Sequence, residues 1–171
     1  KPSKLIDVDL NSESIAILGC AVGLSILINC LLYAANPAYL GVDTEWYYSA
    51  LSNFTPKALI EPRGLYLSML KAASTILGVD QAVKIGPTVL SVIHALTVYL
   101  LVSYNWNKYA GALTAVFAGL TFPLTIGLYA GIYANWLSLS LMILSFHFFI
   151  KAVEENSKSS FLFSLIFLAL S

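Results

Sequence analysis

Apolar segments of about twenty residues recur along this chain, and no other feature constrains its fold as strongly. An α-helix rises about 1.5 Å per residue, so a helix of that length spans the roughly 30 Å hydrocarbon core of a bilayer. The composition agrees, because 58% of the residues are hydrophobic, only 11% are charged and the mean hydropathy is +0.80. We therefore predict an all-α, polytopic helical membrane protein.

Four segments are long enough to span a bilayer, and a fifth begins near the end of the chain. The predicted spans are residues 14–36, 85–104, 109–128 and 133–152, followed by the start of another at 160–171. Pro123 predicts a kink in the third span, and Gly19 and Gly23 form a GxxxG pattern that permits close helix–helix association. Because the chain begins without Met and ends inside "FLFSLIFLALS", we expect residues 1–171 to be the N-terminal part of a longer transmembrane protein.

Residues 37–84 form a long connection in which two stretches, 44–54 and 64–77, have helical periodicity. In the first stretch the polar face is Glu45, Ser49, Ser52 and Asn53, and the apolar face is Tyr47, Ala50, Leu51 and Phe54. In the second stretch the polar stripe is Ser68, Lys71 and Thr75, opposite Leu65, Met69, Ala72 and Ile76. Both stretches are too short to span a bilayer and have one wet face, so we predict two short helices in the membrane interface.

The positive residues of the loops predict the orientation, because cytoplasmic loops are rich in Lys and Arg. With the N-terminus inside, five positive residues fall in short cytoplasmic segments and four fall in the longer loop at 37–84, which is then external. We therefore predict a multi-pass protein of a plasma or endoplasmic-reticulum-type membrane, with a cytoplasmic N-terminus. The formal net charge of zero gives no indication of a nucleic-acid partner.

The stretch "GVDTEWYYSALSNF", residues 41–54, places two carboxylates and three consecutive aromatic residues just beyond the first span. One interpretation is local: Asp43 or Thr44 caps the interfacial helix, Glu45 favours the helix dipole, and the aromatic residues form an interfacial belt. The other interpretation is functional: Asp43 is a general base that acts on a substrate whose other end lies in lipid. The residues alone leave both interpretations open.

Three stretches carry a resemblance to a known family, and they are "GVDTEWYYSAL", "EPRGLYLSMLKAAS" and the run from Tyr133 to Ser171. The first resembles a loop motif in which glycine, an acidic residue and aromatics run into a helix. The second resembles an Arg-Pro-rich segment followed by Leu-Tyr and an interfacial helix, and the third a fourth helix, a short charged turn and the next helix. These are features of the C-type integral membrane glycosyltransferases, which include protein O-mannosyltransferases, lipid A aminoarabinose transferases and oligosaccharyltransferase catalytic subunits.

The resemblance implies that Asp43 is the catalytic acidic residue and that Glu45 is a second carboxylate in a D-x-E arrangement. In members that use a divalent metal such as Mg²⁺ or Mn²⁺, such a pair supplies oxygen ligands, whereas other members need no metal. Two departures matter. The usual Arg-Pro-Pro order appears as Pro-Arg-Gly at residues 62–64, and Asn135 stands where the family often has an acidic residue. The second departure weakens a metal site and leaves open that the chain is an inactive relative.

Basic residues near the interface are candidates for binding a donor phosphate. Arg63 is the only arginine of the chain, and its guanidinium matches phosphate bidentately. Lys57 and Lys71 add positive charge to the same external rim. The alternative is that these side chains simply extend to phospholipid headgroups.

Other polar and aromatic residues complete the predicted site. Tyr47, Tyr133 and Asn135 are candidates for contacts with the sugar. His94 and His147 lie in separate spans, and we predict that each is a hydrogen-bond partner between helices rather than a metal ligand.

The resemblance thus predicts a glycosyltransferase that moves a sugar from a polyprenyl (dolichyl-type) phosphate donor to an acceptor on the external face, with Asp43 as base. The alternative is a non-catalytic membrane subunit or transporter with a similar helical shape. An ion-coupled transporter usually carries ionisable residues in mid-helix, and here we expect only His94 and His147 in such positions.

Overall fold

The computed structural model describes residues 12–35, 44–60, 63–125 and 133–171, and every regular element over these residues is helical. The elements are α1 (Ser12–Ala35), α2 (Thr44–Ser52), the short 3-10 helix η1 (Pro56–Ile60), α3 (Gly64–Leu77), α4 (Val79–Asn105), α5 (Lys108–Thr125), α7 (Tyr133–Glu155) and α8 (Lys158–Leu170). The predicted all-α class is therefore confirmed for the described part of the chain, and the helix predicted at 64–77 has the predicted bounds.

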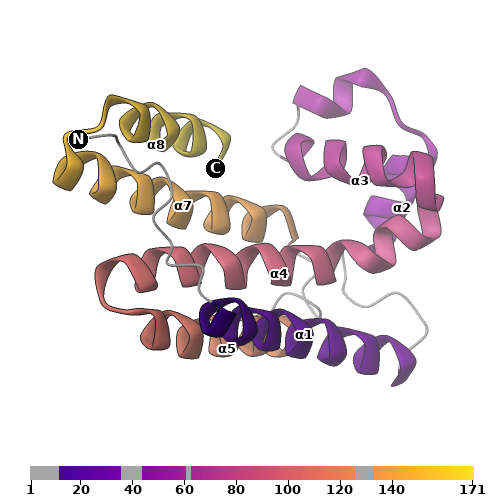
Figure 1. The fold of residues 1–171 in the computed structure, drawn as a ribbon. Coiled ribbons are helices and arrows are strands. Elements are labelled where there is room, and N and C mark those ends of the chain that lie inside the picture. Colours follow the sequence, from indigo (N-terminus) through magenta and orange to yellow (C-terminus); the bar gives the residue numbers. More distant parts are fainter. Residues whose placement is uncertain (1–11, 36–43, 61–62, 126–132) are drawn as a thin grey trace.

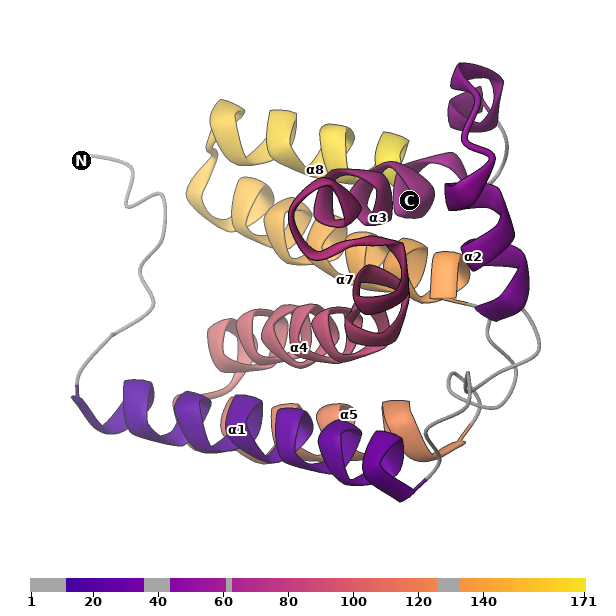
Figure 2. The same ribbon diagram turned by 90° about the vertical axis from the view of Figure 1, so that its right-hand side faces the viewer.

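Helix α4 lies at the centre of the molecule and packs against α1, α3, α5 and α7. Figure 1 shows α1 and α5 along one side of α4 and α7 along the other, with α8 beyond α7. The view in Figure 2 keeps this order, so the long helices form layers with α4 in the middle. Helices α2 and α3 lie together at one end of these layers, beside the first turns of α4.

Side-chain contacts show which helix ends lie together opposite α2 and α3. Lys108, the first residue of α5, forms an ion pair of 2.8 Å with Glu13 in the first turn of α1. Tyr104, near the end of α4, donates a hydrogen bond of 3.5 Å to Glu155, the last residue of α7. The turns after α4 and α7, which we predict to be cytoplasmic, therefore lie at the same end of the bundle.

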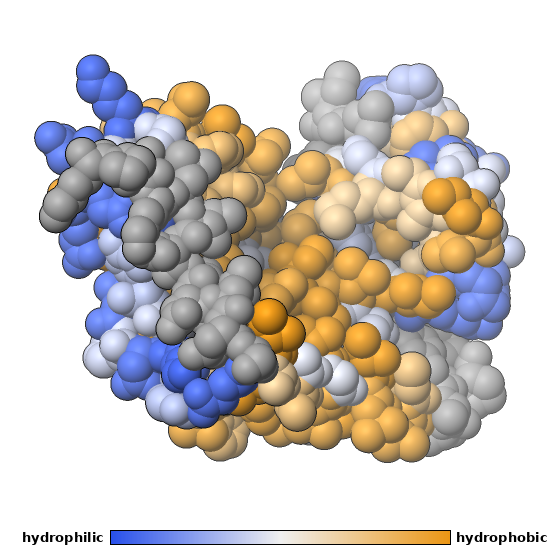
Figure 3. Space-filling view, viewed as in Figure 1, coloured by the Kyte–Doolittle hydropathy of each residue, from blue (hydrophilic) through white to orange (hydrophobic). Residues whose placement is uncertain are grey.

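Hydrophobic residues gather over the middle of the face shown in Figure 3, and hydrophilic residues lie toward its left and right ends. Helix α4 runs from left to right in the same view, so the hydrophobic zone crosses the long helices near their middles. This distribution is typical of helices that cross a bilayer. Among the described helices, α4 and α7 are long and apolar enough to do so.

Helix α4 begins at Val79, before the predicted start of the second span at residue 85. Gly78 joins it to α3 with a φ of 81°, a left-handed conformation that glycine adopts without steric cost. Lys84 and Asp80 then form an ion pair of 2.9 Å one turn apart on the new helix. The sharp turn at Gly78 places α3 directly against the first turns of α4.

The two short helices differ in which of their apolar residues pack against the protein. In α2 the prediction is confirmed, because Tyr47 and Leu51 are buried and the polar residues of the opposite face are exposed. In α3 the predicted apolar face is instead exposed, and Ile76 on that face is 85% exposed. The residues that pack are Gly64, Tyr66, Leu67 and Leu70. Helix α3 therefore has two apolar faces, of which one packs against the protein and the other is exposed on its surface.

Small residues bring α1, α4 and α5 close together. The buried cluster between these helices consists of Ala21, Ala95, Tyr99, Ala112 and Ala115. A Cβ added to Gly111 would lie 2.8 Å from the Cβ of Ser103, so α5 approaches α4 at a point where only glycine fits. Gly19 and Gly23 have no atom within 4 Å of an added Cβ, so their GxxxG pattern is not used between the described helices.

Candidate functional site

Three buried tyrosines from three helices meet at the end of the molecule formed by α2 and α3. Tyr47 belongs to α2, Tyr66 to α3 and Tyr133 to α7, and each is at most 3% exposed. The ring centroids of Tyr47 and Tyr66 lie 5.1 Å apart in a T-shaped pair, and Tyr133 lies 5.8 Å and 6.0 Å from them. These are the distances at which aromatic rings attract one another. We refer to the three residues as the tyrosine cluster.

The first residue of α2 is fixed to this cluster. Thr44 is 1% exposed, and its hydroxyl lies 3.3 Å from the hydroxyl of Tyr133. Asp43, the predicted base or helix cap, is the preceding residue and lies outside the described residues. The structure therefore anchors the start of α2 on α7 directly next to the predicted catalytic position.

Arg63 lies at the edge of the tyrosine cluster. Its guanidinium carbon is 4.9 Å from the ring centroid of Trp46 and 6.0 Å from that of Tyr47, and the residue is half-buried just before α3. Both distances are in the range of cation–π attraction. Stacking engages the face of the guanidinium, whereas its N–H donors lie in the plane of the group. The only arginine of the chain is thus held against the helix that follows Asp43.

The two lysines of the predicted phosphate site are placed differently from Arg63. Lys57 lies in η1 and is exposed. Lys71 is half-buried on α3, and its ammonium group lies 5.1 Å from the ring centroid of Phe54. All three cations belong to the α2–η1–α3 segment, and of the three Arg63 stacks on aromatic rings of α2.

The residues predicted to contact the sugar are divided between core and surface. Tyr47 and Tyr133 are each 1% exposed, so in this structure their rings pack against other rings and present no open surface. Asn135, one residue beyond Ala134 on α7, is exposed. Glu45 is also exposed, on the polar face of α2. Tyr66 completes the cluster and was not predicted, because its position lies off the apolar stripe assigned to α3.

A divalent metal would need several oxygen ligands. Within the described ranges, no group of three or more His, Cys, Asp or Glu residues is close enough to hold a metal ion. Of the predicted D-x-E pair, the structure describes Glu45 alone. A metal at this end would therefore take Glu45 and, beyond the described residues, Asp43.

A second polar cluster lies at the opposite end, between α4 and α7. Lys151 of α7 is 2% exposed, and its ammonium group lies 3.8 Å from Glu155 and 5.8 Å from the ring centroid of Tyr104. The ring of His147 meets that of Tyr104 edge-on, with 5.3 Å between centroids. The expectation concerned mid-helix positions, and Lys151 lies outside them, one turn before the end of α7, although it is buried there.

The two histidines have different contacts. His94 of α4 lies 3.1 Å from the hydroxyl of Ser140 on α7, which confirms its predicted role as a hydrogen-bond partner between helices. His147 instead meets α4 through its ring, and its buried Nδ1 has no hydrogen-bond partner among the described residues.

Comparison with known proteins adds no relative. No protein-family model, no curated protein and no solved structure matches this chain significantly. The assignment of a function therefore depends on the residues and geometry described above.

Proposed function

We propose that this chain is part of a C-type integral membrane glycosyltransferase that transfers a sugar from a polyprenyl phosphate donor to an acceptor on the external face of the membrane. One observation carries the proposal. The only arginine is stacked on α2, and α2 begins directly after Asp43 and is anchored there by Thr44. The predicted phosphate ligand thus contacts the helix whose first residue directly follows the predicted base in the sequence.

In the proposed reaction Asp43 takes the proton of an acceptor hydroxyl or amide, and the acceptor atom attacks the anomeric carbon of the sugar. The bond between that carbon and the donor phosphate breaks, and the polyprenyl phosphate leaves with the bonding electrons. Arg63, with Lys57 and Lys71 nearby on the same segment, stabilises the charge of the departing phosphate. Attack from the side opposite the phosphate inverts the anomeric centre.

The proposed membrane arrangement has four to five spans. Helix α1 has 24 residues and α5 has 18, so both approach the length needed to cross beside α4 and α7, and α8 begins a further apolar helix. The turns after α4 and α7 lie at the same end of the molecule, which supports placing both on the same side of the membrane. With a cytoplasmic N-terminus, the tyrosine cluster lies at the external face. A divalent ion is not required by this scheme, although Asp43 and Glu45 would hold one if it binds.

One observation favours the alternative of a non-catalytic membrane subunit or transporter. Lys151 is a buried cation in an apolar helix, and ionisable groups in such positions are often functional. Its neighbours Glu155 and Tyr104 also satisfy it as a structural group, so it supports the alternative without excluding glycosyl transfer.

The substitution Asp43→Asn tests the proposal. Asn retains the capping oxygen but cannot take a proton, so we expect the rate of transfer to fall about 10²–10⁴-fold while the melting temperature in detergent stays unchanged. The measurement is transfer of labelled sugar by the full chain from polyprenyl phosphate donors that carry mannose, glucose or aminoarabinose. Asp80→Asn is the control, because Asp80 is an ion-paired acid on α4. A folded Asp43→Asn protein that transfers sugar at the wild-type rate would return Asp43 to the role of helix cap.

A further inference from the structure

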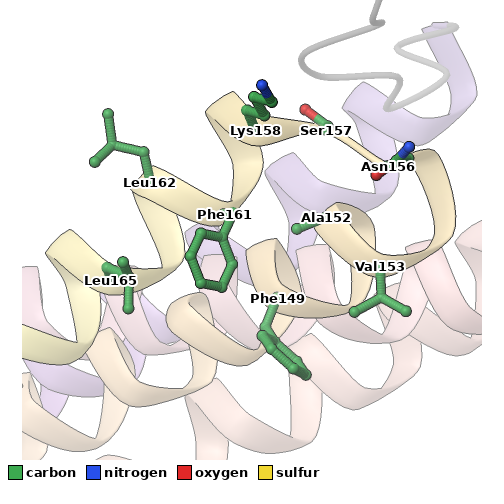
Figure 4. Close-up of a pocket in the computed structure, with 9 residues that line it drawn as sticks. All are labelled: Phe149, Ala152, Val153, Asn156, Ser157, Lys158, Phe161, Leu162 and Leu165. Atoms are coloured by element: carbon green, nitrogen blue, oxygen red, sulfur yellow. The ribbon is translucent and has the colours of Figure 1, made fainter.

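A groove of about 590 Å³ lies between the last turns of α7 and the first turns of α8. Its volume is in the range of sites that bind small ligands. The lining residues are Phe149, Ala152, Val153, Asn156, Ser157, Lys158, Phe161, Leu162 and Leu165. Figure 4 shows the ring of Phe161 pointing from α8 toward α7, and Asn156, Ser157 and Lys158 together at the turn.

The groove has an apolar length and a polar end. Phe149 and Val153 on α7 and Phe161, Leu162 and Leu165 on α8 are all large hydrophobic residues that are 46–68% exposed. The polar residues of the lining are confined to the turn between the two helices. This turn lies at the same end of the molecule as the turn after α4. The chemistry along the groove therefore changes from apolar to polar in one direction, as it does along a phospholipid.

The lining of the groove carries one cation at its polar end. Lys158 is the one charged residue among the nine described residues that line the groove, and it is exposed. The carboxylates of Glu154 and Glu155, on the last turn of α7, are not part of the lining. That of Glu155 lies 3.8 Å from the ammonium group of Lys151 and accepts a hydrogen bond from the Tyr104 hydroxyl. A ligand in the groove therefore meets a cation next to its polar group.

The contact between α7 and α8 is made by small residues and by one group of aromatic rings. Ser145 of α7 donates a hydrogen bond of 2.9 Å to the backbone carbonyl of Ser164 on α8, and the two hydroxyls lie 3.3 Å apart. Ser160 and Ala152 are also buried at this contact. The ring of Phe148 on α7 also packs there, 5.4 Å from that of Phe163 and 5.6 Å from that of Phe167 on α8. The groove residues Phe149 and Phe161 lie at the margin of this contact and are exposed there.

We infer that this groove binds one anionic phospholipid from the membrane leaflet, with an acyl chain along Phe149, Phe161 and Leu165 and the headgroup phosphate at Lys158. Opposite charge at the polar end selects an anionic headgroup over a zwitterionic one, and apolar contact along the helices holds the chain. The inference requires that α7 crosses a membrane, but it does not depend on glycosyl transfer.

The test measures the number and affinity of lipids bound to the full chain by native mass spectrometry in detergent. The probes are phosphatidylglycerol and phosphatidylcholine with identical acyl chains. We expect one phosphatidylglycerol to bind more tightly than phosphatidylcholine. Lys158→Gln should weaken phosphatidylglycerol about fivefold and leave phosphatidylcholine unchanged. Lys108→Gln, at the same end but ion-paired with Glu13, is the matched control and should change neither affinity.

A second variant tests the apolar part of the groove. Val153 is 68% exposed, so Val153→Trp fills the groove with little expected effect on folding and should weaken both lipids. Leu139→Trp is its control, because Leu139 is an exposed residue of α7 outside the lining. Equal affinity of the wild type for the two lipids would overturn the inference. An equal loss in Lys158→Gln and Lys108→Gln, or a dimer of the chain that Val153→Trp disrupts, would also overturn it.

Discussion

At the tyrosine cluster three helices meet through large aromatic rings that are at most 3% exposed. Helices α7 and α8 meet through buried serines and through the ring of Phe148, which lies 5.4 Å from that of Phe163 and 5.6 Å from that of Phe167. The first region is closed by the protein itself. In the second, Phe149 and Phe161 are each nearly half exposed, so their apolar surface depends on whatever surrounds the helices. Both regions are built from apolar α-helices, and they differ in where the bulky residues point.

The difference explains why the candidate site lies where it does. A reacting group must be held in a precise position relative to its substrate, which requires side chains locked by packing. The tyrosine cluster supplies such packing for the start of α2 and for Arg63. The α7–α8 pair leaves the rings of Phe149 and Phe161 nearly half exposed and suits the adaptable binding of a lipid chain instead.

The largest expected difference between the regions concerns stability. Tyr47→Ala removes a ring that contacts Tyr66 and Tyr133, and loss of a buried aromatic side chain costs about 3–5 kcal/mol. Phe161→Ala removes a ring that is 48% exposed and should cost less than about 1 kcal/mol. The free energy of unfolding of each variant in mixed micelles is the measurement. Equal losses would show that the two regions are held together in the same way.

The sequence predicts the helices of both regions better than it predicts their faces. Period and length placed α3 at 64–77, and the polar face of α2 followed from Glu45 and Ser49. The predicted apolar stripe of α3 did not show which apolar residues contact protein, because a membrane-associated helix has no need to turn all its apolar residues inward. Tyr66 and Ile76 are both apolar enough to face protein or lipid, so only the tertiary contacts decide which one is buried.

Charged positions show the same limit. Lys151 has a partner four residues along, which reads in sequence as an ordinary surface pair with Glu155. Its burial arises from the ring of Tyr104 on α4, a contact between distant parts of the chain. Arg63 was singled out from its residue type alone, whereas its stacking on Trp46 depends on how α2 and α3 pack together.

The second prediction concerns the function of the tyrosine-cluster end. Arg63→Lys retains the charge but lacks the planar fork that binds phosphate bidentately. We expect donor binding to weaken by about 1–3 kcal/mol, with a smaller change in the free energy of unfolding. Titration of the full chain with a polyprenyl phosphate sugar, beside unfolding in micelles, measures both. An unchanged donor affinity would assign Arg63 to stacking and headgroup contacts only.

The third prediction addresses how weakly α7 and α8 are joined. Ser145→Ala removes both hydrogen bonds to Ser164 and should cost about 0.6 kcal/mol, the typical value for a hydrogen bond between membrane helices. Ser164→Ala removes only the contact between hydroxyls and should cost less, because the backbone carbonyl remains as acceptor. Unfolding of the two single variants and the double variant gives the coupling between them. A loss above about 2 kcal/mol for Ser145→Ala would place this contact in the class of the tyrosine cluster.

The smallest expected effect comes from Glu13, which lies at the end of the molecule opposite the tyrosine cluster. Its carboxylate accepts hydrogen bonds of 2.8 Å from Lys108 and 2.9 Å from the Tyr109 hydroxyl. The hydrogen bond from Lys108, followed by that from Tyr109, holds the pKa of Glu13 below its ordinary value.

Because the pKa is lower in the folded protein, the contribution of Glu13 to stability is complete above the ordinary glutamate pKa. It is lost as the pH falls through the lowered value. The difference in melting temperature between the wild type and Glu13→Gln should therefore be small near pH 6 and disappear once the pH has fallen below the lowered pKa. It should also shrink in about 1 M salt, because Glu13 is 52% exposed and its charge is screened. A difference that stays constant across this pH range would show that α1 and α5 are joined here by packing, as the helices of the tyrosine cluster are.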